Sequence, residues 1–191
     1  MMIRKSRQAL VLAVVLLTGL VTNAHGHSLP GSVLVFSEEM QQQESQLTLK
    51  VTFPLEDMII ASNKLEMIQG APINQALSEQ ATQLLADYFS QHMKVQKDQQ
   101  DLPFTLQKAE LNKAYHHDLG EYILVVSYFT APKPEGGKLF PLILSYDAVM
   151  HEIRSHRATV YWQETNGDQQ KLVRFRFKRE EGKPKAYLLN R

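Results

Sequence analysis

Two histidines near the start of the chain, in His25-Gly26-His27, have the type and spacing of a metal-binding terminus. If the chain is cut after Ala24, the new terminus carries a free amine and has a histidine at its third position. The amine, two backbone amides and the imidazole of His27 can then hold Cu(II) or Ni(II) in one plane. A cut after Gly26 removes this arrangement, although the amine and ring of the new first residue still form a chelate. A polar terminus that binds no metal is the alternative.

Asp147, His151 and His156 form a second group of possible metal ligands. Asp147 and His151 are four residues apart, which places them on one face if this turn is helical. One carboxylate and two imidazoles are acceptable ligands for zinc, nickel or copper, but the spacing matches no strong metal motif. The alternative is that Asp147 and His156 brace a loop between two strands through hydrogen bonds.

The remaining histidines have simpler interpretations. His116-His117-Asp118 lies just before a turn at Gly120 and is expected to be a solvated loop, because adjacent residues of a strand point to opposite faces. His92 lies on the apolar stripe of a predicted helix and is expected to be a core histidine. No G-x-S-x-G, P-loop or G-x-G-x-x-G pattern occurs, and no cysteine is present as a nucleophile. We therefore expect a protein that is not an enzyme, with an enzyme as the minor alternative.

The first 24 residues have the features of an export signal. A basic start contains Arg4, Lys5 and Arg7, an apolar run extends from Ala9 to Val21, and small residues surround Ala24. The apolar run is short for a membrane span, which takes about 20 apolar residues. The sequence predicts a signal peptide over residues 1–24 and one domain over residues 25–191, located in the periplasm or otherwise exported. Retention by an uncleaved N-terminal segment is the alternative.

Charge and composition limit the possible partners. The predicted signal contains three basic and no acidic residues, so residues 25–191 contain 18 basic and 20 acidic residues. This balance predicts no nucleic-acid surface. Because the chain has no cysteine, the exported domain cannot form disulfides and must be stabilised mainly by its core.

Alternating apolar and polar residues predict a domain that is mainly β. In Gln46–Phe53 every second residue is apolar, as in a strand with one buried face. Asn166-Gly167 is the strongest hairpin signal in the chain. We expect an antiparallel β-sandwich-like domain, with a layered α+β arrangement as the alternative. The expected strands are Val33–Phe36, Gln46–Phe53, Phe104–Leu111, Tyr122–Thr130, Leu139–Tyr146, Ala158–Gln163 and Lys171–Phe177.

One amphipathic helix is expected to cover a face or an open end of the sheets. Pro72 suits the first position of a helix, and apolar residues recur from Ile73 to Met93 at helical spacing. This pattern predicts a helix of about six turns. Leu55–Ile60 is ambiguous, and Asn63–Gly70 could be a loop or a helical turn.

The segment from Tyr146-Asp147 to His156-Arg157, followed by the apolar strand Ala158–Trp162, resembles the exported N-terminal domain of HupE/UreJ-like membrane proteins. In that family a Tyr-Asp pair precedes a His-Arg pair at a similar spacing. His151 stands where the family pattern has an acidic residue. Looser similarities, in the same order along the chain, are a histidine at the end of the signal, Leu47–Pro54 leading into Leu55-Glu56-Asp57, the helix around Leu84–Phe89 and the strand Tyr122–Tyr128.

The resemblance implies a free-standing version of this exported domain. The membrane part of the family is linked to nickel or cobalt uptake, and transport is not implied because this sequence lacks that part. The expected function is that of an exported domain that binds Cu(II) or Ni(II), or that assists a metal-related membrane protein with several spans. A structural or interaction module without metal is the main alternative.

Overall fold

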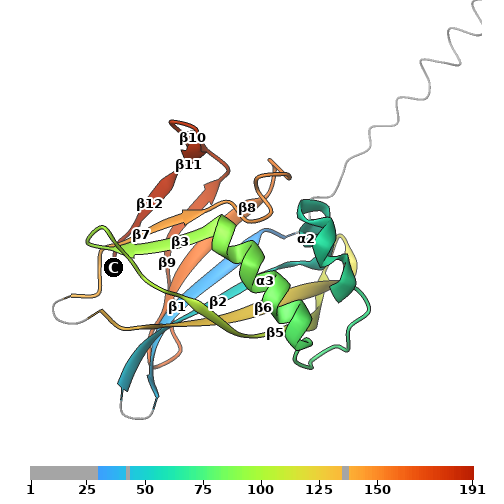
Figure 1. Cartoon of the computed structure of the whole chain (residues 1–191), viewed down its shortest axis with the longest axis horizontal. Coiled ribbons are helices and arrows are strands. Elements are labelled where there is room, and N and C mark those ends of the chain that lie inside the picture. The colour runs from blue at the N-terminus through green and yellow to red at the C-terminus, as the bar shows by residue number, and fades with distance from the viewer. Residues whose placement is uncertain (1–29, 42–43, 135–137) are drawn as a thin grey trace, which may run out of the picture.

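The computed structural model describes residues 30–41, 44–134 and 138–191, and two β-sheets dominate this part of the chain (Figure 1). The larger sheet has six strands in the order β5-β6-β2-β1-β8-β9, and the smaller has four in the order β12-β7-β3-β4. The strands are β1 (Ser32–Gln41), β2 (Glu44–Pro54), β3 (Met93–Lys97), β4 (Gln100–Asp101), β5 (Thr105–His116), β6 (Gly120–Pro132), β7 (Leu142–Tyr146), β8 (Arg157–Gln163), β9 (Gln169–Arg176), β10 (Arg179–Glu180), β11 (Lys183–Pro184) and β12 (Ala186–Leu189).

The larger sheet follows the period of two that the sequence predicts. Leu47, Leu49 and Val51 of β2 are buried on one face, whereas Lys50 on the opposite face is exposed. β8 and β9 form a hairpin at the predicted turn, where Gly167 has a φ of +90°. β1 pairs with β8 in parallel, while the other neighbouring strands of this sheet are antiparallel. This parallel pair joins the start of the described chain to the hairpin of β8 and β9.

The smaller sheet packs against part of the larger one. Leu142 and Leu144 of β7 belong to the same buried core as Leu34 of β1 and Val160 of β8. Tyr146 at the end of β7 meets Phe175 of β9 edge to face, with ring centroids 6.4 Å apart. Two sheets packed face to face confirm the predicted β-sandwich-like, mainly β domain.

Helices cover the part of the larger sheet that lies beyond the smaller one (Figure 1). They are α2 (Leu55–Ala61), the 3-10 helix η1 (Asn63–Ile68) and α3 (Glu79–His92). Phe89 of α3 packs on Phe53 of β2 and Phe129 of β6, with ring centroids 5.7 and 5.1 Å apart. The C-terminal end of α3 thereby lies at the boundary between the two sheets, where β3 begins at Met93.

The predicted start of the long helix at Pro72 is wrong. α3 has 14 residues and begins after Ser78, whose hydroxyl accepts a hydrogen bond from the Ala81 amide at 3.3 Å. The residues before it run beside β5, because the Asn74 and Leu77 amides donate to the carbonyls of Leu111 and Ala109. This segment forms isolated bridges and a turn at Asn74, so the helical spacing of its apolar residues does not reflect a helix.

Short strands and helices were the elements that the pattern did not resolve. The ambiguous segment Leu55–Ile60 is helix α2, and Asn63–Gly70 contains η1. The predicted set lacks β3 and β12, which have five and four residues, and the two-residue strands β4, β10 and β11. Within the described residues, none of the helices is long and apolar enough to cross a membrane.

Candidate metal centre

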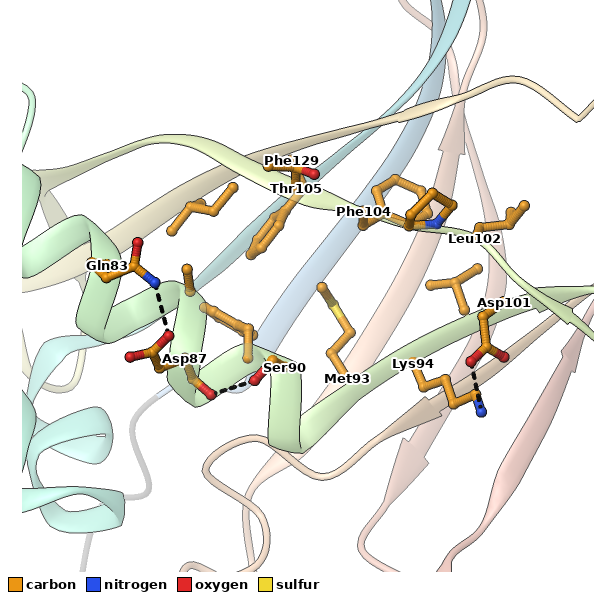
Figure 2. Close-up of a pocket in the computed structure, with 15 residues that line it drawn as sticks. Gln83, Asp87, Ser90, Met93, Lys94, Asp101, Leu102, Phe104, Thr105 and Phe129 are labelled. Carbon is orange, nitrogen blue, oxygen red and sulfur yellow. Dashed lines mark hydrogen bonds and ion pairs between the residues drawn. The ribbon is translucent and has the colours of Figure 1, made fainter.

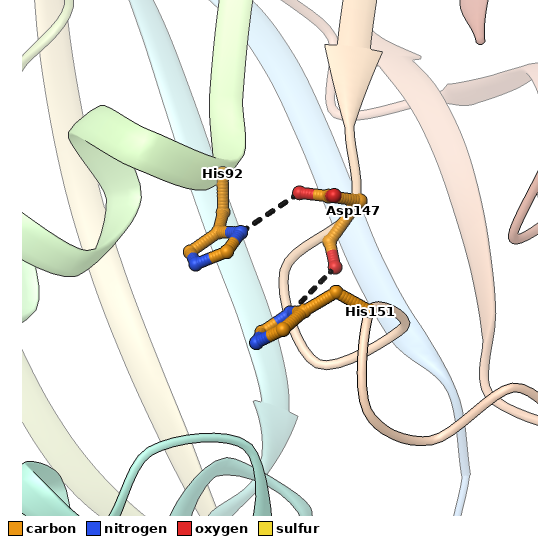
Figure 3. A group of neighbouring side chains, drawn as sticks. All are labelled: His92, Asp147 and His151. Carbon is orange, nitrogen blue, oxygen red and sulfur yellow. Dashed lines mark hydrogen bonds and ion pairs between the residues drawn. The ribbon is translucent and has the colours of Figure 1, made fainter. Parts of the chain in front are cut away.

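His92, Asp147 and His151 lie together at the boundary between the two sheets (Figure 3). His92 is the last residue of α3, and Asp147 directly follows β7. The Asp147 amide donates to the His92 carbonyl at 3.0 Å, and the two side chains meet through His92 Nδ1 and Asp147 Oδ1 at 2.8 Å. One ligand atom from each of the three side chains lies within 4.8 Å of the others. Residues 55 positions apart are thus held together by both backbone and side chains.

A tight turn places His151 beside this pair. Its amide donates to the Asp147 carbonyl at 3.0 Å, and its Nδ1 lies 3.2 Å from the same oxygen. The His92 and His151 rings are stacked, with centroids 4.1 Å apart and planes inclined by 12°. Asp147 and His151 therefore lie side by side as the sequence predicts, although they belong to a tight turn rather than to a regular helix.

The hydrogen bonds fix which ring nitrogens are available. An ionised carboxylate and a backbone carbonyl can only accept, so Nδ1 of His92 and Nδ1 of His151 must both donate. In the neutral rings each Nε2 then carries a lone pair, and both Nε2 atoms are turned to the same side, away from Asp147 (Figure 3). Metal-binding histidines commonly have this arrangement, with one nitrogen held by a carboxylate or carbonyl and the other free to coordinate.

The turn between Asp147 and His151 is strained. Val149 has a φ of +66°, a value that is unfavourable for a β-branched residue, and its side chain is completely buried. The Val149 amide donates to the Tyr88 hydroxyl at 2.8 Å, and the Tyr88 ring also packs on His92 with centroids 4.6 Å apart. Tyr88 and His92 are four residues apart on α3, so one helix face holds both the strained turn and the first imidazole. Strain of this kind is concentrated at functional sites.

His156, the third predicted ligand, belongs to a different group. Its Nδ1 donates to Asp57 Oδ2 of α2 at 2.9 Å, and its Nε2 accepts from the Ser32 amide at 2.9 Å. Nε2 also lies 2.8 Å from Ser32 Oγ, to which the Tyr146 hydroxyl donates at 3.0 Å. These four residues are all buried. The structure therefore does not bring His156 together with Asp147 and His151, and it places His156 as a brace between α2, β1 and β7.

The order Asp57–His156–Ser32 is that of a hydrolytic triad, but its surroundings favour a structural role. A nucleophilic serine must reach substrate, and its histidine must be free to take its proton. Ser32 is 1% exposed, its oxygen already accepts from Tyr146, and Nε2 already accepts a backbone amide. The chain of hydrogen bonds thus satisfies buried polar groups of three elements.

Burial raises the pKa of the Tyr88 hydroxyl, and burial likewise raises the pKa of Tyr146. In the unfolded chain tyrosine ionises near pH ~10, so the folded state, which holds these protons more tightly, loses stability as the pH rises from about 10 upward. We expect urea midpoints to fall in that range as tyrosinate absorbance appears. Tyr146→Phe should make the fall shallower, whereas Tyr115→Phe, at an exposed ring, should leave its slope unchanged. A slope that Tyr146→Phe does not alter would contradict this assignment.

The other predicted histidines are placed as follows. His25 and His27 lie outside the residues that the structure describes, so their metal-binding mode stays a prediction. His116 ends β5, and His117 and Asp118 are exposed in the turn that follows, as expected for a solvated loop. These three groups also approach within 4.8 Å of one another, with His117 Nε2 2.9 Å from Asp118 Oδ2.

A groove of about 740 Å³ runs between α3, β3 and the segment that leads into β5 (Figure 2). Phe104, Met93 and Phe129 contribute apolar surface to it. At its edge Lys94 and Asp101 form an ion pair at 3.0 Å. A second cavity of about 700 Å³ is lined by His92 and by residues of α2, η1 and α3, so solvent approaches the first imidazole from that side.

No model of a known protein family matches the chain, and no curated protein matches it. The resemblance to the exported domain of HupE/UreJ-like proteins therefore stays a prediction. Three of the four residues that carry the resemblance have a defined side-chain contact: Tyr146 with Ser32, Asp147 with His92, and His156 with Asp57. Sequence reasoning missed His92 and Asp57 as the partners, because each is distant in sequence and lies in or beside a helix.

Proposed function

We propose that this protein is an exported, non-enzymatic domain that binds a transition-metal ion at His92, His151 and Asp147. The observation that carries the proposal is the pair of stacked imidazoles whose Nδ1 atoms both donate to Asp147, so that both Nε2 atoms are free on one side. Imidazole nitrogens suit nickel, copper, zinc and cobalt. Asp147 would orient the two rings, His92 through its carboxylate and His151 through its backbone carbonyl.

Two protein ligands leave several coordination positions open. An open metal site exchanges its ion or binds a further ligand, in contrast to a closed structural site with four protein ligands. Such a site suits a domain that receives an ion and presents it to a partner. The predicted export signal and the family resemblance favour a membrane protein with several spans as that partner.

Calorimetric titration with Ni(II), Cu(II), Co(II) and Zn(II) tests the proposal. We expect one ion per chain, and we expect His151→Ala to weaken its affinity by at least roughly ten-fold, because one of two imidazole ligands is lost. Asp147→Asn should weaken affinity by about 10–100-fold through loss of the carboxylate that orients His92. Melting temperatures of the unliganded variants show whether any loss reflects unfolding.

Two matched variants locate the site. The double variant His116→Ala, His117→Ala removes two imidazoles from the exposed hairpin turn and should leave the affinity unchanged. Removal of His25 and His27 tests the predicted N-terminal mode on the correctly processed chain. Binding that depends on His25 and His27 and survives His151→Ala would place the ion at the terminus and contradict this proposal.

A further inference from the structure

We propose that the outer face of the larger sheet carries a second binding site, for a small oxyanion such as a phosphate or a carboxylate. The site is a cavity of about 350 Å³ at the point where β1 begins. Arg157 and Thr159 of β8, Arg174 of β9 and Ser155 contribute to its lining, and His116 reaches it from the end of β5. The lining also includes Ser32 and His156, but it does not include His92, Asp147 or His151, so this site is separate from the proposed metal site.

The charge of this cavity is unbalanced. No acidic residue lines it, whereas each of four other surface cavities has a carboxylate in its lining, such as Asp87 or Glu38. In residues 30–41, 44–134 and 138–191, Arg191 is the one arginine that pairs with a carboxylate. Two acidic residues contact members or neighbours of the lining: Asp57 pairs with His156, and Asp118 pairs with His117 in the turn after His116. Arg157 and Arg174 therefore line one cavity, and neither of them pairs with a carboxylate among the described residues.

The positions of the arginines in the sheet lower its stability. Arg157 of β8 stands directly opposite Arg176 of β9, and like charges in opposed positions destabilise an antiparallel pair. Thr159 stands opposite Arg174 in the same register, so the hydroxyl and the second guanidinium share the outer face with Arg157. Arg176 does not line the cavity, but an anion bound beside Arg157 would offset part of the repulsion between the two arginines.

Gly31 fixes the backbone on which Arg157 is mounted. A Cβ atom added at Gly31 would lie 2.1 Å from the Arg157 carbonyl oxygen, so only glycine permits this approach. Arg157 itself is half-buried, which limits the freedom of its side chain. The first cation of the site is thus positioned by packing rather than left as a mobile surface group.

The chemistry of the lining defines the ligand class. A guanidinium offers a planar set of N–H donors that matches two oxygens of a carboxylate or phosphate. The hydroxyls of Thr159 and Ser155 can donate to the remaining oxygens. The volume is near the lower end of the range for small-molecule sites, so the site fits a compact anion rather than a large cofactor.

Titration with inorganic phosphate and with succinate at constant ionic strength tests the site. We expect at least one of them to bind and to raise the melting temperature. Arg174→Gln should weaken that binding by about ten-fold or more, because charge-assisted hydrogen bonds are lost. Lys171→Gln removes one positive charge from the same strand and should change the affinity by less than about two-fold.

Three results would overturn the proposal. One is the absence of binding of either anion at millimolar concentration to the folded wild-type protein. Another is an equal loss in Arg174→Gln and Lys171→Gln, which would indicate general attraction by a basic surface. The third is binding to phosphatidylglycerol vesicles, reduced equally in both variants and without binding of the free anions, which would make this face a membrane contact.

Discussion

Replacing His156 by alanine is expected to lower the free energy of unfolding by about 3–5 kcal/mol, because it leaves the Asp57 carboxylate buried without its hydrogen-bond partner. The His156 side chain is 1% exposed and contacts Asp57 and Ser32 through both ring nitrogens. Without it, the Asp57 carboxylate and the Ser32 amide lose these partners inside the protein. Urea denaturation should show the loss, and the melting temperature should fall by roughly 6–20 °C.

His117→Ala is the matched control for this prediction. The same substitution at an exposed ring should change stability by less than about 0.5 kcal/mol. The double variant Asp57→Ala, His156→Ala should be less destabilised than the sum of the two single variants, because each single change leaves the other group buried and unpaired. A cost below about 1 kcal/mol for His156→Ala would show that the network is not a brace.

The strands could be predicted because burial on one face imposes a period of two on the sequence. Leu47, Leu49 and Val51 are separated by residues of the outer face, and the hairpin of β8 and β9 has its own local signal at Gly167. The parallel pairing of β1 with β8 could not be predicted in this way. Alternation says which face of a strand is buried, and it does not identify a neighbour more than 100 residues away.

The start of α3 shows a second limit of prediction from sequence. Ile73 and Ala76 form isolated bridges with Leu111 and Glu110 of β5, so tertiary pairing determines their conformation. Their spacing nevertheless continues the stripe of α3. Ser78, a favourable residue before a first helical turn, was the local signal that marked the true start.

The candidate site was predictable only where its residues are close in sequence. Asp147 and His151 are four apart, and the structure places them together as expected. Spacing alone assigned His156 to the same group, although it is bound to Asp57, which is 99 positions away. It also treated His92 as a core residue, because the sequence does not show that α3 ends against β7.

The buried hydrogen-bond network around His156 and the proposed metal site are connected through adjacent residues at the end of β7. Tyr146 donates to Ser32 in the buried brace, while Asp147, the next residue, accepts from His92 at the proposed metal site. Distortion of the brace is therefore expected to displace Asp147 as well. The metal affinity of a folded His156 variant would therefore show whether a change in the buried network also displaces Asp147 at the proposed metal site.

Phe89→Ala is expected to have the second large effect, a loss of about 3–5 kcal/mol of stability, as for other large aromatic residues removed from a core. Phe89 is 1% exposed and packs on Phe53, Phe129 and Tyr88, with ring centroids 5.1 to 5.7 Å apart. α3 has few other aromatic residues that pack on the larger sheet. Loss of the Phe89 ring therefore leaves a cavity between α3 and strands β2 and β6. Equilibrium urea denaturation measures the loss.

Matched variants distinguish the contribution of the Phe89 ring to stability from that of helix α3 as a whole. Gln91→Ala, at an exposed position of α3, should change stability by less than about 0.5 kcal/mol. Phe89→Leu should cost less than Phe89→Ala because it restores most of the lost apolar contact. Since α3 carries both Tyr88 and His92, metal affinity should fall in Phe89→Ala even where the domain remains folded. Retained stability and affinity in Phe89→Ala would show that the strained turn at Val149, rather than the helix, holds the imidazoles in place.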